Sequence, residues 1–227
     1  MQSNVLVFAK RSLNLSKILA GMGLGLAALG IFVIFALSLL AGSSSAAVFF
    51  LPVSFMSLGL VIFTMPVTLL YVYDKNNGVL EHLLSLGWNQ SDVFKQYLKA
   101  ALFLAVILFT GEGAAILIAG AISGSTSVFL LDLLMLFLTA FLGFSVVSLL
   151  SVAMMAFSSL QKQRVGANTP LGMVIGVPFI FPTFYLSFIG FIPELTVVLS
   201  LCILAGALSG SLMLLSSRLI RREKMLP

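Results

Sequence analysis

Charged residues are scarce in this sequence: Asp, Glu, Lys and Arg make up 8% of its 227 residues, whereas soluble domains carry roughly 25%. Hydrophobic residues make up 60%, and the mean hydropathy is +1.19. A chain of this size has no room to hide so much apolar surface in one globule, because small domains leave a large share of their surface in water. Lipid accommodates such a surface, so the sequence predicts an integral membrane protein.

Residue types that carry chemistry are also rare. The chain has one cysteine, Cys202, and one histidine, His82, which excludes an internal disulfide and a histidine-rich zinc site. It contains no GxxxxGK[ST] phosphate loop and no HExxH pair. No basic stripe is interleaved with aromatic residues, as nucleic-acid binding would require. The sequence therefore predicts a chain that is not itself an enzyme, holds no cofactor or metal and binds no nucleic acid.

Six long apolar runs are separated by short polar segments. Because the runs are apolar all round rather than alternating, they are typical of membrane helices and not of barrel strands. The first run exceeds the roughly 7–15 residues of a signal-peptide core and is expected to be retained. We expect an all-α protein with one transmembrane domain over 1–227. The predicted spans are 18–41, 46–73, 100–122, 128–158, 170–191 and 195–217.

The basic residues indicate how these spans are oriented. All twelve Lys and Arg fall in the segments 1–17, 74–99, 159–169 and 218–227, and the three intervening links carry none. Segments rich in Lys and Arg stay on the cytoplasmic side of a membrane. The sequence therefore predicts that both termini are cytoplasmic and that the links on the outer side are short.

The polar segment 74–99 contains the most informative pattern. Four apolar residues recur along one face of a short helix, and Glu81, His82 and Ser85 lie off that face. Gly87 is expected to end this helix. A second helix is expected to begin near Ser91 and to lead into the third span. The apolar residues are Val79, Leu80, Leu83 and Leu84.

This segment resembles the one that follows the second span in ABC-2-type permeases, the membrane subunits of one class of ATP-binding-cassette exporters. An acidic residue, a glycine, a glutamate and a pair of leucines recur there in the family. Val79 departs from the threonine that is common in the family, and Gly87-Trp88 stands where a proline is usual. The residues that match are Asp74, Gly78, Glu81, Leu83 and Leu84, followed by Ser91-Asp92-Val93-Phe94.

The resemblance implies a type V exporter-like architecture with a cytoplasmic amphipathic helix before the first span and a coupling helix between spans two and three. It implies a second permease subunit, identical or different, and two copies of an ATP-binding subunit that hold ATP and magnesium. The implied location is the plasma membrane of a prokaryotic cell. The residues implied to couple to the ATPase are Asp74, Gly78, Val79, Leu80, Glu81, Leu83 and Leu84.

Both surface helices have a second interpretation. The apolar face of the 79–84 helix is suited to an ATPase partner or to the membrane surface. The segment before the first span places Lys10, Asn14 and Lys17 on one face, with Val5, Phe8 and Leu15 largely on the other. Such a helix either touches the ATPase or anchors the chain to anionic headgroups, and both interpretations stay open.

Two acids fall within predicted spans, Glu112 in the third and Asp132 near the outer end of the fourth. An acid inside the membrane is costly and is a functional candidate by default. Glu112 is a candidate pathway residue, with a hydrogen bond to Thr110 or to a neighbouring serine as the structural alternative. Asp132 is close enough to the membrane surface to reach water.

Glycine and proline mark two further features. Gly21 and Gly25, and likewise Gly206 and Gly210, have the GxxxG spacing that allows helices to approach closely. Prolines and phenylalanines gather late in the fifth span, and the resemblance implies short re-entrant helices there, against a kinked helix as the simpler reading. The prolines are Pro178, Pro182 and Pro193.

Other functions remain open besides an exporter permease. A heme-exporter-type permease belongs to the same superfamily. An ion-coupled secondary transporter would use Glu112, but such proteins usually show paired broken helices in internal repeats, and no convincing repeat is found. A membrane scaffold that transports nothing is the third alternative. The sequence does not identify a substrate.

Overall fold

The computed structural model describes residues 2–39, 47–123 and 126–158, together with isolated positions between 200 and 211. Within the three continuous ranges the chain is helical, with short turns and no strand. The fifth predicted span and its prolines lie outside the described residues, and the sixth span is described only at isolated positions. The helices are α1 (Gln2–Leu15), α2 (Lys17–Leu39), α3 (Ala47–Asn76), α4 (Val79–Ser85), α5 (Gln90–Ser123) and α6 (Thr126–Ser158).

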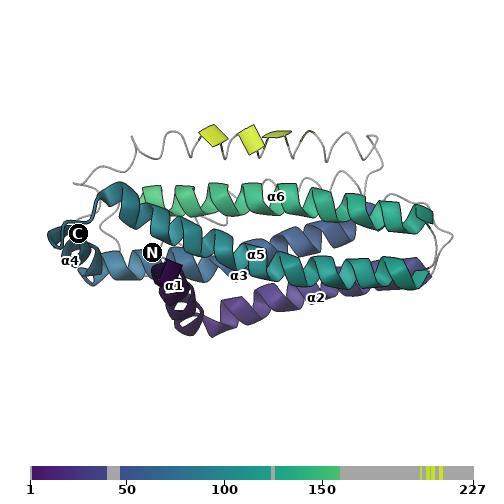
Figure 1. Cartoon of the computed structure of the whole chain (residues 1–227), viewed down its shortest axis with the longest axis horizontal. Coiled ribbons are helices and arrows are strands. Elements are labelled where there is room, and N and C mark those ends of the chain that lie inside the picture. Colours follow the sequence, from purple (N-terminus) through teal and green to yellow (C-terminus); the bar gives the residue numbers. More distant parts are fainter. Residues whose placement is uncertain are drawn as a thin grey trace.

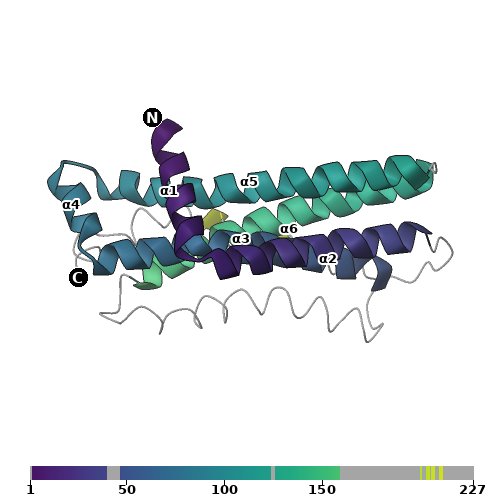
Figure 2. The same cartoon turned by 90° about the horizontal axis from the view of Figure 1, so that it is seen from below.

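Four of the helices form an elongated bundle. Helices α2, α3, α5 and α6 run lengthwise beside one another, as Figures 1 and 2 show. The short helix α4 joins α3 to α5 at one end of the bundle, and α1 lies across α3 and α5 near that end. Because α5 runs opposite to both α3 and α6, the latter two point in the same direction.

Among the described residues, three helices are long and apolar enough, by length and composition, to cross a membrane. The segments are Lys17–Ala36 in α2, Phe55–Asn76 in α3 and Gln90–Ile118 in α5, and a shorter apolar stretch, Leu136–Ser148, lies in α6. With 30 and 34 residues, α3 and α5 are roughly 45 and 51 Å long at 1.5 Å per residue. Both exceed a hydrocarbon core of about 30 Å. These helices are consistent with a membrane protein.

Small residues bring α2 close to α3. The buried positions of α2 recur every three or four residues, and all but the last are glycine or alanine. A Cβ added to Gly23 would lie 2.6 Å from the backbone nitrogen of Phe63, and one added to Gly30 would lie 2.6 Å from Cγ of Met56. Only glycine fits at these two points of helix crossing. The buried positions are Ala20, Gly23, Ala27, Gly30 and Ile34.

The glycines expected to mediate close packing are not the ones that α2 uses within this chain. A Cβ at Gly21 or Gly25 would have no heavy atom within 4 Å among the described residues. Gly206 is different, because a Cβ there would lie 3.1 Å from Cζ of Phe141 in α6. The GxxxG spacing in α2 therefore marks an open surface, and the neighbouring Gly23 and Gly30 make the contact with α3.

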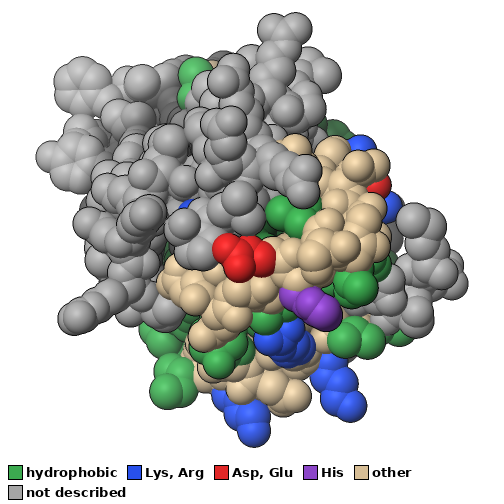
Figure 3. All heavy atoms as spheres, turned by 90° about the vertical axis from the view of Figure 1, so that its left-hand side faces the viewer, with side chains coloured by type: hydrophobic (Ala, Val, Ile, Leu, Met, Phe, Trp, Pro, Cys, Tyr) green, Lys and Arg blue, Asp and Glu red, His purple; other side chains and the backbone are tan. Residues whose placement is uncertain are grey.

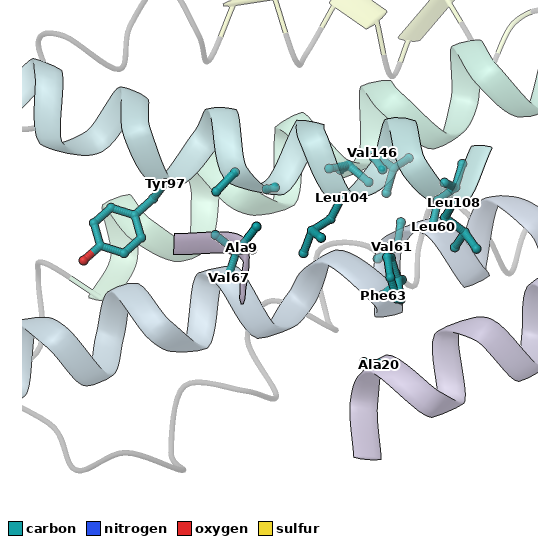
Figure 4. Close-up of a cluster of buried hydrophobic side chains, with 14 of the residues drawn as sticks. Ala9, Ala20, Leu60, Val61, Phe63, Val67, Tyr97, Leu104, Leu108 and Val146 are labelled. Carbon is teal, nitrogen blue, oxygen red and sulfur yellow. The ribbon is translucent and has the colours of Figure 1, made fainter. Parts of the chain in front are cut away.

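The core of the bundle lies between α3, α5 and α6. Figure 4 shows Leu60 and Val67 of α3 beside Leu104 and Leu108 of α5, with Val146 of α6 behind them. All of these side chains are buried. The opposite surfaces carry large exposed apolar side chains, including Ile18 and Phe32 of α2, which are 79% and 68% exposed. A surface of this kind suits lipid rather than water.

The α2–α3 packing predicts different effects for two neighbouring glycines. Gly23→Ala forces a methyl group against the backbone of Phe63, so we expect a loss of about 1–3 kcal/mol of stability, as in other overpacked cores. Gly21→Ala adds the same methyl group in open space, where alanine favours the helix by up to about 1 kcal/mol. Thermal unfolding of the purified protein in detergent would compare them. Equal midpoints for the two variants would contradict the close contact at Gly23.

Candidate functional site

The predicted coupling residues lie where α3 ends and α4 begins. Asn77 and Gly78 turn the chain, and Gly78 adopts a left-handed backbone with φ of 72°. Gly87, whose φ is 86°, follows the end of α4. Side chains with a Cβ rarely adopt these angles, so glycine sets both turns. The expectation that Gly87 ends the helix is confirmed, and α4 is confined to the seven residues Val79–Ser85.

The apolar face of α4 is covered by the chain itself. Leu80 is completely buried, and Leu84 is 9% exposed. Val79 is half-buried, and the half-buried Leu83 packs against the hydrophobic core. For Leu80 and Leu84, the expectation that they need a partner or a membrane surface to cover them is therefore not met, since α4 folds back onto the ends of α3 and α5.

The outward face of α4 is polar. Glu81, His82 and Ser85 are exposed, and Leu86, which follows the helix, is 63% exposed. Figure 3 looks at this end of the bundle and shows the purple side chain of the only histidine near acidic and basic side chains. The exposed Glu81, His82 and Ser85, and not the leucines, are what α4 itself presents to its surroundings, and the basic side chains nearby come from other segments because α4 has no Lys or Arg.

Asp74 is the predicted site residue with the best-defined surroundings. Its side chain is fully buried, and its carboxylate forms an ion pair with Arg11 of α1, with 2.7 Å between Nη2 and Oδ1. Arg11 Nη1 also donates to Oδ2 at 3.2 Å, and the hydroxyl of Tyr97 donates to Oδ2 at 2.6 Å. A buried carboxylate is stable only with such partners. Asp74 thus joins α1, α3 and α5.

Aromatic rings complete this junction. The ring of Tyr97 lies 4.7 Å from that of Phe8 in α1, between centroids, and 5.2 Å from that of Tyr71 in α3. The Tyr71 and Tyr97 rings meet edge to face at 86°, a favoured geometry for aromatic pairs. We call Phe8, Arg11, Tyr71, Asp74 and Tyr97 the junction cluster.

The helix α1 contributes Phe8 and Arg11 to the junction cluster and leaves its opposite face exposed. Lys10 and Asn14 of α1 are exposed, as expected from their spacing, and so is Lys17, the first residue of α2. Phe8 is half-buried against the core, but Leu15 is 43% exposed, against the expectation that it shares the covered face. Sequence reasoning counted Arg11 only as a basic residue and missed its role. No local signal distinguishes it from Lys10, because its partner is 63 positions away.

Glu112 lies in a different part of the bundle. Its side chain is 1% exposed, and neither carboxylate oxygen has a hydrogen-bond partner among the described residues. The bond to Thr110, one of the alternatives for this side chain, does not form, because the hydroxyl of Thr110 donates to the carbonyl of Ile107 at 2.7 Å. The side chain of Asp132 is outside the described part of the structure.

Known metal-site patterns do not occur in the described ranges, which hold no group of three or more His, Cys, Asp or Glu side chains suited to a metal ion. No protein-family model matches the chain, and searches of curated proteins and of solved structures found no match. The functional argument therefore depends on the arrangement of this chain's own residues.

The junction cluster predicts unequal effects for two adjacent basic residues. Arg11→Ala leaves the buried carboxylate of Asp74 with Tyr97 as its one remaining partner. We therefore expect the free energy of unfolding to fall by about 1–3 kcal/mol, the usual penalty for an unsatisfied buried group. Lys10→Ala removes the same charge from the exposed face of α1, and we expect a change within about 0.5 kcal/mol. Thermal unfolding measures both. A loss for Lys10→Ala as large as that for Arg11→Ala would reject the specific ion pair.

Proposed function

We propose that this chain is the permease subunit of an ATP-binding-cassette exporter in the plasma membrane. In this proposal it has six spans with both termini in the cytoplasm. It pairs with a second permease subunit, identical or different, and with two ATP-binding subunits that hold ATP and magnesium. The observation that carries the proposal is α4, a helix of seven residues placed across the end of the bundle with its apolar face held inside and its polar face outward.

The proposed coupling depends on how firmly α4 is attached. Buried Leu80 and Leu84 fix α4 to the bundle, and Asp74, just before α4, is bonded to α1 and α5. A force applied to α4 would therefore move the ends of α3 and α5 together with α1. Because α3 and α5 each run through the bundle without a break, this motion would reach the far end, as an ATP-driven change of access requires.

In this proposal the residues of the predicted coupling set have different roles. Asp74, Leu80 and Leu84 are internal supports, and Gly78 sets the direction of the turn. Contact with the ATPase would come from the outward side chain of Glu81, with the exposed His82 and Ser85 beside it. Charged side chains at the edge of an interface set specificity and association rate. The half-buried Val79 and Leu83 would lie at the margin of this contact.

The first expected outcome is physical association with an ATPase. Purified gently from its native membrane, the chain should carry an ATP-binding subunit with it, because it has a coupling-type helix and no phosphate loop of its own. Mass spectrometry and ATP hydrolysis in the purified fraction measure this. Transport by the purified chain alone, without ATP, would reject the proposal.

The outward face of α4 should be needed for that association. Glu81→Lys reverses an exposed charge, so folding should be unchanged, while recovery of the ATPase should fall by about tenfold, which corresponds to ~1.4 kcal/mol. Leu84→Asp is unsuitable because Leu84 is buried and the change would unfold α4 itself.

Asp92→Lys is the matched control for this experiment. It makes the same charge change at an exposed position in the first turn of α5, outside α4. Fluorescence of Trp88, the only tryptophan, which packs against the core next to α4, reports whether local folding is intact. Equal ATPase recovery for the wild type, Glu81→Lys and Asp92→Lys would exclude the polar face of α4 as the contact.

A further inference from the structure

Three buried polar side chains in the middle of the bundle have no hydrogen-bond partner among the described residues. They are Ser57 of α3, Glu112 of α5 and Thr139 of α6, each no more than 1% exposed. Between them they present four oxygen atoms: two hydroxyl oxygens and both carboxylate oxygens of Glu112. Buried polar atoms are nearly always paired, so each exception requires an explanation.

Contacts between α5 and α6 place Glu112 and Thr139 at similar positions along the long axis of the bundle. A Cβ on Gly113 would lie 3.6 Å from a methyl carbon of Leu136, so these two residues face each other. Glu112 is next to Gly113 in α5, and Thr139 is three residues beyond Leu136 in α6. At 1.5 Å per residue, the difference in depth is about one helical turn or less.

Contacts between α3 and α6 place Ser57 at the same depth. A Cβ on Gly143 would lie 2.5 Å from Cδ1 of Leu60. Ser57 precedes Leu60 by three residues, and Thr139 precedes Gly143 by four. Because α3 and α6 run in the same direction, these steps lead to the same cross-section of the bundle. The three unpaired side chains therefore share one level on three neighbouring helices.

Other hydroxyl groups in these helices behave differently. Serine and threonine in a helix commonly donate to a carbonyl three or four residues earlier. Three threonines of α3 and α5 do so, whereas the hydroxyls of Ser57 and Thr139 do not. The bonds are Thr64 to Val61 at 2.9 Å, Thr68 to Met65 at 2.7 Å and Thr110 to Ile107 at 2.7 Å. The oxygens of Ser57 and Thr139 thus keep their full capacity to bind another group.

The helices around Glu112 supply no cation to balance its charge. The nearest basic residue on α5 is Lys99, thirteen positions away, or about 20 Å along the helix. The only basic residue of α2 is Lys17 at its start, that of α3 is Lys75 near its end, and α6 has none. The remaining charged residues of these helices are Asp74 of α3, Asp92 and Lys95 of α5 and Asp132 of α6.

We propose that Ser57, Glu112 and Thr139 bind one monovalent metal cation between α3, α5 and α6. Carboxylate and hydroxyl oxygens are hard ligands that suit such ions better than soft metals. A monovalent ion neutralises the single carboxylate, whereas a divalent ion would leave a net positive charge in a low-dielectric interior, which is costly. The site does not require an ATPase partner and goes beyond the proposed function.

Sodium ions provide the direct test. The full-length protein in detergent is heated at fixed pH and ionic strength while Na⁺ replaces N-methylglucamine. Because a ligand that binds only the folded state stabilises it, the midpoint of thermal unfolding should rise steadily with Na⁺ concentration, by about 5–10 °C at roughly 100 times Kd. Glu112→Gln should abolish this rise, and binding of radioactive ²²Na⁺ should be lost in parallel.

The hydroxyl groups are tested separately, so that the test does not depend on the Glu112→Gln variant folding. Ser57→Ala and Thr139→Val should each raise the Na⁺ concentration needed for a given rise of the unfolding midpoint by about tenfold or more. Thr64→Val is the matched control, because it removes a buried hydroxyl that is already bonded within α3. Its response to Na⁺ should match that of the wild type.

Several outcomes would overturn the proposal. A midpoint that responds to pH through Glu112 but not to Na⁺ would show that a proton alone neutralises the site. Stronger stabilisation by Ca²⁺ than by Na⁺ would reject a monovalent ligand. A full Na⁺ response in Glu112→Gln, or an equal loss in Thr64→Val and Thr139→Val, would place the effect elsewhere in the protein.

Discussion

The buried carboxylate of Asp74 imposes the constraint on which the rest of this structure depends. A charge taken out of water requires both a counter-ion and hydrogen-bond donors, and here they come from two other helices. Arg11 supplies the positive charge from α1, and Tyr97 supplies a hydroxyl donor from α5. Satisfying one side chain therefore fixes α1 across the bundle and sets the level at which α3 and α5 meet.

The position of α4 follows from that constraint. With Asp74 level with Tyr97, only a short stretch of chain is left to join α3 to α5, and α4 fills it between two left-handed glycines. Its leucines have to turn inward because the ends of α3 and α5 are directly beneath them. The same geometry that buries Leu80 and Leu84 leaves Glu81 and His82 outward, which gives the proposed coupling surface its polar character.

The two acids that are buried among the described side chains of the bundle differ in how their charge is balanced. Asp74 lies near the end of α3, where basic residues are available, and its charge is balanced within the chain. Glu112 lies about 20 Å from the nearest lysine of its own helix, beyond the reach of any basic side chain there, and its oxygens have no partner among the described residues. The arrangement around Asp74 makes it a permanent structural support. The arrangement around Glu112 leaves its carboxylate available for the cation that we propose.

The amino-acid sequence by itself determined where helices form and where they stop. A long apolar run in lipid has to be helical, because a helix pairs its own backbone groups. A glycine such as Gly87 ends a helix because it readily adopts a left-handed backbone. These are local effects, so the extents of α2, α3 and α6, the amphipathic pattern of α4 and the exposed basic face of α1 could be read from neighbouring residues. The six spans and the ATPase partner stay predictions.

Only the tertiary structure decided which faces meet. Gly21 and Gly23 are equally small, yet only Gly23 lies against Phe63. Lys10 and Arg11 carry the same charge, yet only Arg11 reaches Asp74. The sequence showed that α4 has an apolar face, but it did not show that the ends of α3 and α5 would cover that face. Such choices depend on how helices cross and on side chains many positions apart in the chain, and local sequence patterns carry no information about either.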